Sequence, residues 1–130
     1  MSHSARFKTC PGCKKKWFSR DEMLYDPDVT LLGYQVHFVD YNLGLFYFNH
    51  NSSNCKTTFA IKVSEFADLY DGPVFSEVKM ADENCPMYCL RRTELGECDQ
   101  PCAGAFVREV MQIINKIHKE VIQSSLSAVY

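Results

Sequence analysis

Seven cysteines and one well-placed histidine are the residues of this sequence most able to do chemistry. The cysteines form two groups: C-P-G-C at residues 10–13 with Cys55, and two C-x3-C pairs within residues 85–102. Thiolates can bind zinc, hold an iron–sulfur cluster or form disulfides. Because seven is odd, a monomer cannot pair every cysteine in disulfides. One site of three cysteines and a histidine plus one site of four cysteines would use all seven.

The first group predicts a zinc site. C-P-x-C is the form of a zinc knuckle, in which a tight turn aims two thiolates at one point. His50 and Cys55, spaced H-x4-C, supply the second ligand pair directly after a predicted strand, as in zinc ribbons. The predicted Zn²⁺ ligands are therefore Cys10, Cys13, His50 and Cys55. The long stretch between Cys13 and His50 requires a larger insertion than a minimal ribbon has.

Two alternatives to zinc remain for the first group. Cys10 and Cys13 could be incidental surface thiols, or they could form a thioredoxin-like redox C-x-x-C. The redox motif requires a preceding strand and a following helix in a βαβ unit, and only ARFKT precedes Cys10. A c-type haem is disfavoured because Lys14 follows Cys13 where that motif needs histidine.

The second group predicts another metal or redox site. Its four cysteines are Cys85, Cys89, Cys98 and Cys102. They could hold Zn²⁺ or an iron–sulfur cluster, form disulfides or a reversible thiol switch, or stay unlinked. Between the pairs, Arg91 and Arg92 could help to keep the thiolates ionised. The spacing alone does not distinguish zinc from iron.

Composition indicates a soluble, cytoplasmic chain of one domain. Its 130 residues can bury a core without disulfides, and the sequence has no apolar run long enough to cross a bilayer. The polar start MSHSARFKTC is not typical of a signal peptide. A net charge of −2 gives no electrostatic argument for a nucleic-acid or membrane partner. The short basic stretch with Lys14, Lys15, Lys16, Trp17 and Arg20 leaves nucleic-acid binding as a weak alternative.

Three strands and one long helix must position these ligands. Residues 31–39 and 45–50 alternate in hydrophobicity with a turn between them, and residues 57–63 form a third strand. We expect Leu32, Tyr34, Val36 and Phe38 to share the buried face of the first strand. The second strand predicts a buried row of Phe46, Phe48 and His50, and the third a row of Phe59, Ile61 and Val63.

Two helices are predicted after the strands. Residues 65–70 predict a short helix, and residues 105–124 a long one. On the long helix an apolar seam steps by three and four residues. The seam residues are Val107, Val110, Ile114, Ile117 and Val121. Such a seam could pair two copies of the chain or bind a protein partner.

These stretches together resemble a group of small uncharacterised bacterial cysteine-rich proteins. The resemblance lies in TCPGC, LLGYQVHF, GLFYFNH, CKTTFAIKVSEFADLYDGPVF, CPMYC and ECDQPC, and it covers most of residues 9–112. That group has no assigned activity, and its members occur alone or beside sensor and signalling modules, so the resemblance implies an association with signalling. The cysteines of both groups and His50 match the group's pattern, although the NSSN loop before Cys55 is longer than usual.

We therefore predict an α+β fold with a small antiparallel sheet, a zinc-ribbon-like site, a cysteine-rich loop and a long C-terminal helix. Residues 1–103 would form the metal-binding domain, and residues 104–130 a helix that packs on it or on a partner. The predicted function is a non-enzymatic zinc-binding module for sensing or protein interaction, because four protein ligands leave no open position for a catalytic water. The alternative is a redox protein or sensor that uses an iron–sulfur cluster or thiol switch at Cys85–Cys102.

Overall fold

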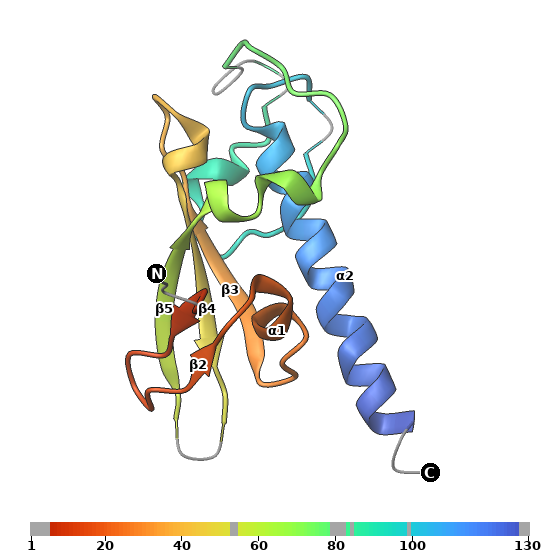
Figure 1. Ribbon diagram of the computed structural model, residues 1–130. Coiled ribbons are helices and arrows are strands. Elements are labelled where there is room, and N and C mark those ends of the chain that lie inside the picture. The colour runs from red at the N-terminus through yellow and green to blue at the C-terminus, as the bar shows by residue number, and fades with distance from the viewer. Residues whose placement is uncertain (1–5, 53–54, 79–82, 84, 99, 128–130) are drawn as a thin grey trace. The chain divides into compact units, whose positions relative to one another are not determined.

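The computed structural model describes residues 6–52, 55–78, 83, 85–98 and 100–127 (Figure 1). The strands are β1 (Lys8–Thr9), β2 (Lys16–Trp17), β3 (Val29–Gln35), β4 (Leu45–His50) and β5 (Thr57–Lys62). The α-helices are α1 (Arg20–Leu24) and α2 (Ala105–Ser127). Four 3₁₀ turns are η1 (Tyr41–Leu43), η2 (Val63–Glu65), η3 (Ala67–Leu69) and η4 (Tyr88–Leu90). The predicted α+β class, with small antiparallel sheets and a C-terminal helix, is confirmed.

The chain forms two compact units that interleave along the sequence. The first contains residues 1–31, 48–59 and 114–130, and the second contains residues 32–47 and 60–113. Strands β3, β4 and β5 and helix α2 contribute residues to both units. The predicted division at residues 103 and 104 stays a prediction, and residues 128–130 of its second part lie outside the described residues.

The first unit begins with a short hairpin and a capped helix. Strands β1 and β2 pair antiparallel, with Lys8 opposite Trp17. Ser19 is the N-cap of α1 and accepts a hydrogen bond from the Glu22 backbone N–H, which satisfies one of the helix's unpaired donors. Trp17 is fully buried, and its ring packs against that of Phe59, with ring centroids 5.5 Å apart. The hairpin is therefore anchored to the core of the unit by one aromatic side chain.

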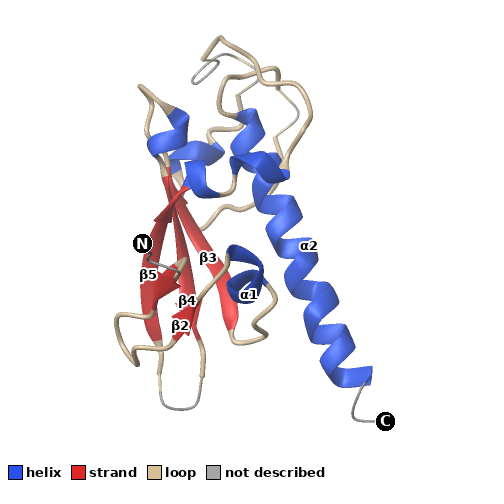
Figure 2. Ribbon diagram, viewed as in Figure 1, coloured by secondary structure: helices blue, strands red, loops and turns tan. Residues whose placement is uncertain are grey.

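The three-stranded sheet has the order β3-β4-β5, drawn as neighbouring red arrows in Figure 2. Both predicted rows of the second and third strands are confirmed. Phe46, Phe48 and His50 of β4 are at most 2% exposed, because alternate residues of a strand share one face. Phe59, Ile61 and Val63 are buried as well.

Strand β3 differs from the prediction in its start and in its buried face. It begins at Val29 and ends at Gln35, whereas the predicted strand spans residues 31–39. Tyr34 is buried as predicted, but Leu32 is 47% exposed and Leu31 is buried instead, so the assignment of Leu32 to the buried face is wrong. Phe38, expected on the same buried face, lies beyond the strand and is 40% exposed.

The helices also differ in detail from the prediction. Instead of a short helix at residues 65–70, the chain forms the 3₁₀ turns η2 and η3, and no side chain caps either of them. Helix α2 begins at Ala105 as predicted and continues to Ser127. Of its seam residues, Val107, Val110 and Ile114 are buried within the single chain. Only the later seam residues, Ile117 and Val121, are half-buried.

Asp26 fixes the loop between α1 and β3. One carboxylate oxygen accepts a hydrogen bond from Trp17 Nε1 at 2.9 Å and pairs with Lys15 Nζ at 3.1 Å, while the other accepts from the Asp28 backbone N–H. Burial opposes the charged form, but these partners outweigh it, and the pKa of Asp26 is lowered.

Replacing Asp26 with asparagine should destabilise the protein by about 1–3 kcal/mol at neutral pH, because charge-assisted hydrogen bonds to a buried carboxylate are lost. A carboxyl whose folded pKa is depressed stabilises the fold above its ordinary pKa of about 3.9, and this stabilisation is lost as the pH falls through the folded value. The gap between wild type and Asp26→Asn should therefore close below about pH 4 in urea unfolding. The exposed neighbour provides the control, Asp28→Asn, which should show no such gap.

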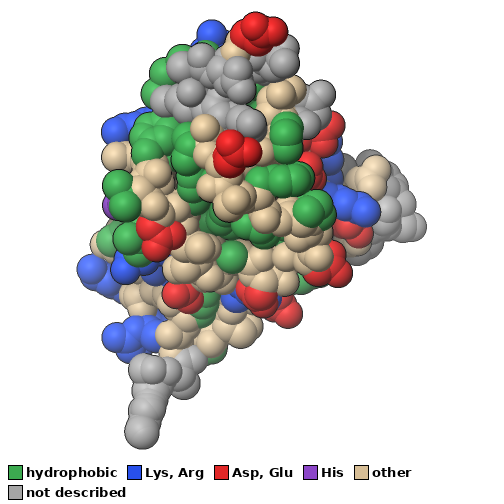
Figure 3. Space-filling model, turned by 90° about the horizontal axis from the view of Figure 1, so that it is seen from above, with side chains coloured by type: hydrophobic (Ala, Val, Ile, Leu, Met, Phe, Trp, Pro, Cys, Tyr) green, Lys and Arg blue, Asp and Glu red, His purple; other side chains and the backbone are tan. Residues whose placement is uncertain are grey.

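Large hydrophobic side chains remain on the surface of the second unit. Those at least 44% exposed are Leu32, Val39, Leu43, Val74, Val78 and Leu90. Figure 3 shows hydrophobic side chains lying among acidic and basic ones on the upper face. Such scattered exposure is ordinary for a folded protein and identifies no binding site.

Candidate metal centre and a second cysteine pocket

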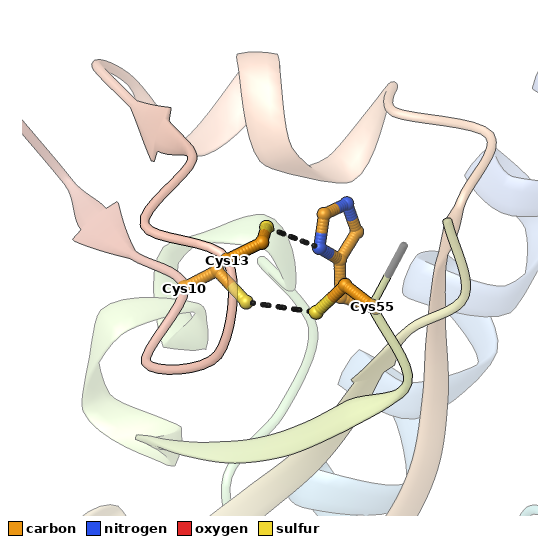
Figure 4. A group of neighbouring side chains, drawn as sticks. Cys10, Cys13 and Cys55 are labelled. Carbon is orange, nitrogen blue, oxygen red and sulfur yellow. Dashed lines mark hydrogen bonds between the residues drawn. The ribbon is translucent and has the colours of Figure 1, made fainter. Parts of the chain in front are cut away.

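The first predicted ligand set converges in the first unit. Cys10 follows β1, Cys13 lies in the hairpin turn, His50 ends β4, and Cys55 precedes β5. Their sulfur and nitrogen atoms all lie within 4.8 Å of one another. In Figure 4 the three cysteine side chains point toward one another and toward the imidazole. The sequence-based selection of these four residues as neighbours is therefore confirmed.

The distances fit a tetrahedral ion. Cys10 Sγ lies 3.5 Å from Cys55 Sγ, and Cys13 Sγ lies 3.5 Å from His50 Nδ1. A tetrahedral zinc with Zn–S near 2.3 Å and Zn–N near 2.0 Å separates its ligand atoms by roughly 3.5–3.8 Å. Cys10, His50 and Cys55 are buried, whereas Cys13 is exposed. The arrangement can hold a metal ion such as zinc with one ligand facing solvent.

The hairpin turn aims the first two thiols. The Cys10 backbone N–H donates to the Lys15 carbonyl at 2.8 Å, and the Lys14 N–H donates to the Cys10 carbonyl at 3.0 Å. Lys14 adopts a left-handed conformation with φ of 68°, which closes the turn directly after Cys13. Gly12 lies so close to Thr57 that a Cβ atom at this position would overlap the Thr57 hydroxyl.

Replacing Gly12 with alanine should therefore displace the knuckle from β5. We expect a destabilisation of about 1–3 kcal/mol, as for other overpacked sites, and a weaker first metal site. Thermal unfolding and a competitive metal titration measure the two effects. Gly96→Ala is the matched control, because its Cβ would meet only the end of the flexible Glu94 side chain. Equal effects of the two substitutions would contradict the role of the close contact.

Thr57 is a site residue that the sequence did not reveal. Its hydroxyl and its backbone N–H both hydrogen-bond Cys55 Sγ, and Cys10 and His50 interact with the same sulfur. Burial raises the pKa of Cys55, but these interactions outweigh it and lower the pKa to about 6. A thiolate is the metal-binding form of cysteine, so Thr57 favours ligation. No spacing rule connects a threonine two residues after a ligand with this role, and only the path of β5 brings it there.

The second group of cysteines lines one pocket in the second unit. Cys85, Cys89, Cys98 and Cys102 line it and are half-buried, and the buried side chains of Tyr41 and Arg108 line it as well. Cys85 Sγ accepts a backbone hydrogen bond from the Met87 N–H at 3.4 Å. Met87 is left-handed, with φ of 63°. Besides Lys14, it is the one non-glycine residue of the described chain with positive φ, and both residues lie beside a cysteine pair.

These four sulfurs do not form a second compact ligand set. Among the described residues, the only group of metal-ligand atoms all within 4.8 Å of one another is the first set. The same pocket nevertheless collects both C-x3-C pairs, and no disulfide joins any of the described cysteines. The second predicted site therefore stays a prediction.

The loop that carries these cysteines is fixed by the rest of the second unit. The Tyr34 N–H of β3 donates to the Arg92 carbonyl at 2.8 Å, and Gly33 allows this approach because a Cβ there would lie 2.9 Å from the same oxygen. From α2, Gln112 Nε2 donates to the Leu95 carbonyl at 2.7 Å, and Arg108 Nη1 donates to the Glu94 carbonyl. Side chains of α2 thus add to the backbone hydrogen bonds that hold the loop.

The cation beside the second group is not the predicted one. Arg91 and Arg92 are exposed, and the Arg92 guanidinium lies over the Tyr47 ring. Arg108 is fully buried and lines the cysteine pocket. The sequence offered no indication of this, because Arg108 is one basic residue in an otherwise ordinary helix.

The basic stretch near the N-terminus has intramolecular partners. Lys15 pairs with Asp26, and Lys14 Nζ donates to the Pro11 carbonyl at 3.1 Å. Trp17 is fully buried and cannot stack on a base. Lys14, Lys15 and Lys16 themselves are exposed, so the weak nucleic-acid alternative stays a prediction.

No protein-family model, curated protein or solved structure matches this chain. Within the part of the chain that the structure describes, none of the helices has the length and apolar character needed to cross a membrane.

Proposed function

We propose that this protein is a non-enzymatic zinc-binding module of the cytoplasm that serves sensing or protein interaction. The observation that supports it is the convergence of Cys10, Cys13, His50 and Cys55 from separate segments of the chain. Three thiolates and an imidazole are the donors that zinc favours, and a full set of four protein ligands is typical of structural sites. We expect the bound ion to hold the hairpin against β4 and β5.

Metal content per chain, measured on protein purified without oxygen, tests this proposal. We expect at least one zinc per chain and loss of that zinc in a Cys10→Ser/Cys13→Ser variant. A wild-type protein that retains no metal and does not bind added Zn²⁺ or Co²⁺ with three-sulfur coordination would refute it.

The second candidate function is a redox protein or sensor centred on residues 85–102. The specific observation in its favour is that all four cysteines of this loop line one pocket beside a buried cation. Four thiolates there could hold a second Zn²⁺ or an iron–sulfur cluster, or cycle between thiol and disulfide. An absorbance spectrum of the anaerobic protein separates these possibilities, because a cluster absorbs in the visible range and zinc does not. Colourless protein whose thiols resist oxidation would leave zinc.

We further propose that α2 provides the surface for a protein partner or a second copy, in keeping with the signalling association that the sequence resemblance implies. Since Val107, Val110 and Ile114 are buried within the chain, Ile117 and Val121 are the seam residues left for such a contact. Light scattering at high concentration tests the pairing, and a strictly monomeric chain would exclude self-association through α2.

A further inference from the structure

Arg108 is a buried cation with only part of its hydrogen-bonding capacity used. Its side chain is fully buried, and Nη1 donates to the carbonyls of Glu94 and Gly96. Among the described residues, Nε and Nη2 have no hydrogen-bond partner. These two N–H groups form the side-on fork of a guanidinium, which favours anions.

The described neighbours of Arg108 hold it in place and bring no carboxylate against it. Its guanidinium carbon lies 5.7 Å from the Tyr34 ring centroid and 5.4 Å from that of Tyr88. The contacts described for it are to carbonyl oxygens, aromatic rings and the Cys89 thiol, and none is to a carboxylate of the described residues. Arginine keeps its charge in proteins, and a buried charge without a counter-charge costs several kcal/mol. The fork therefore needs an anionic partner in this pocket.

The cysteines that line the same pocket are the candidates for that partner. Four thiolates around Zn²⁺ carry a net charge of about −2, and an oxidised two-iron cluster with four thiolates carries the same charge. Sulfur accepts N–H hydrogen bonds, as Cys85 does here from the Met87 backbone. Burying the anion or the guanidinium alone costs free energy because each loses its hydration. Their mutual attraction offsets this cost when the two are buried together.

We propose that Arg108 is the internal counter-cation of a second, four-thiolate metal centre, with Nε and Nη2 donating N–H···S hydrogen bonds to its cysteine sulfurs. This inference rests on the second site proposed above. It adds that the centre carries net negative charge and that a residue of α2, outside the cysteine loop, determines how tightly it is held. Arg108 is a positioning residue, since it acts through the ligands.

A cobalt titration of the full chain under anaerobic conditions tests the proposal, because Co²⁺ reports thiolate ligation in its absorbance. The variants are Arg108→Met, which keeps the volume, and Arg108→Lys, which keeps the charge but loses the fork. Arg92→Met is the matched control, since Arg92 also lies over a tyrosine ring but is exposed. A Cys85→Ser/Cys98→Ser variant identifies which bands belong to the second centre.

We expect Arg108→Met to lower the affinity for the second Co²⁺ by about 10–100-fold, as for other residues that hydrogen-bond metal ligands, and to shift its sulfur-to-cobalt band. Arg108→Lys should recover most of the affinity but not the band position, and Arg92→Met should match wild type. The first site's cobalt spectrum and far-UV circular dichroism report folding in every variant. If Arg108→Met does not fold, the test uses Arg108→Lys instead. A shifted sulfur-to-cobalt band of the second site in that variant then supports the role of Arg108, and an unchanged band contradicts it.

The outcomes separate the inference from the site on which it rests. If wild type binds two Co²⁺ and a folded Arg108→Met binds the second one with unchanged affinity and spectrum, the role of Arg108 is wrong and the second site stands. If wild type binds one Co²⁺ only, the second site itself is wrong, and the inference falls with it. Arg108-dependent binding of inorganic phosphate in place of the second metal would likewise overturn it.

Discussion

Replacing His50 with glutamine should abolish tight binding of the first metal ion. The imidazole Nδ1 lies 3.5 Å from Cys13 Sγ, and a neutral amide is a much poorer zinc ligand. Structural zinc sites contribute on the order of 10–16 kcal/mol of apparent binding free energy, so one ligand of four accounts for roughly 3–4 kcal/mol, or about 10²–10³-fold in affinity. Competition against a chromophoric chelator measures this loss.

His37, the other histidine of the sheet region, provides the control for His50. His37 lies in an exposed loop, where its Nδ1 accepts a hydrogen bond from the Asp40 backbone N–H. His37→Gln should bind metal and melt like wild type. Chelation should lower the melting temperature of wild type and His37→Gln, because ligand binding to the folded state stabilises it, but it should leave His50→Gln nearly unchanged. Equal chelator sensitivity of the two variants would show that His50 is not a ligand.

Replacing Trp17 with alanine should be among the most destabilising single changes in the chain. The side chain is fully buried, its ring centroid lies 5.1 Å from that of His50, and its Nε1 donates to Asp26. Truncating a buried tryptophan costs about 3–5 kcal/mol. Because the ring supports β2 and a metal ligand together, the first metal site should weaken in parallel. Urea unfolding followed by circular dichroism measures the stability.

The residue directly after β2 makes a matched control for Trp17. Phe18 is 56% exposed, and Phe18→Ala should change stability by about 0.5 kcal/mol or less. Trp17→Phe should fall between the two, because it keeps an aromatic ring but leaves Asp26 without its indole donor. A similar loss for Trp17→Ala and Phe18→Ala would contradict the anchoring role of the indole.

The sequence predicted the first site well because period-two patterns report side-chain direction. The alternation of β4 placed His50 on the same face as Phe46 and Phe48, and that face is the buried one. The knuckle motif supplies two thiolates, so a tetrahedral zinc site needs two more ligands. His50 and Cys55 offer an imidazole nitrogen and a thiolate at the H-x4-C spacing. Local patterns were therefore sufficient to identify four candidate ligands from distant parts of the chain.

Other features depend on tertiary contacts that no local pattern contains. In β3 the buried position of Tyr34 was assigned correctly, but that of Leu32 was not, because Leu31 and Leu32 are equally apolar and only packing decides between them. Arg108 is buried because carbonyl oxygens of the cysteine loop and the rings of Tyr34 and Tyr88 surround it. The path of that loop is determined by α2 side chains, which act across long sequence separations.

The large separation of the first ligand pairs has a consequence for how the chain acquires its fold. Cys10 and Cys55 are 45 positions apart, so an ion bound to both would close a long loop and remove much of the conformational entropy of the unfolded chain. Contacts of such high separation form slowly, and a bound ion would favour the ensemble in which they have formed. During synthesis Cys10 and Cys13 leave the ribosome first, and a four-ligand site can form only after His50 and Cys55 have followed. The 85–102 loop and Arg108 leave the ribosome later still. All four candidate ligands of the first site would thus be available before the second group of cysteines is complete.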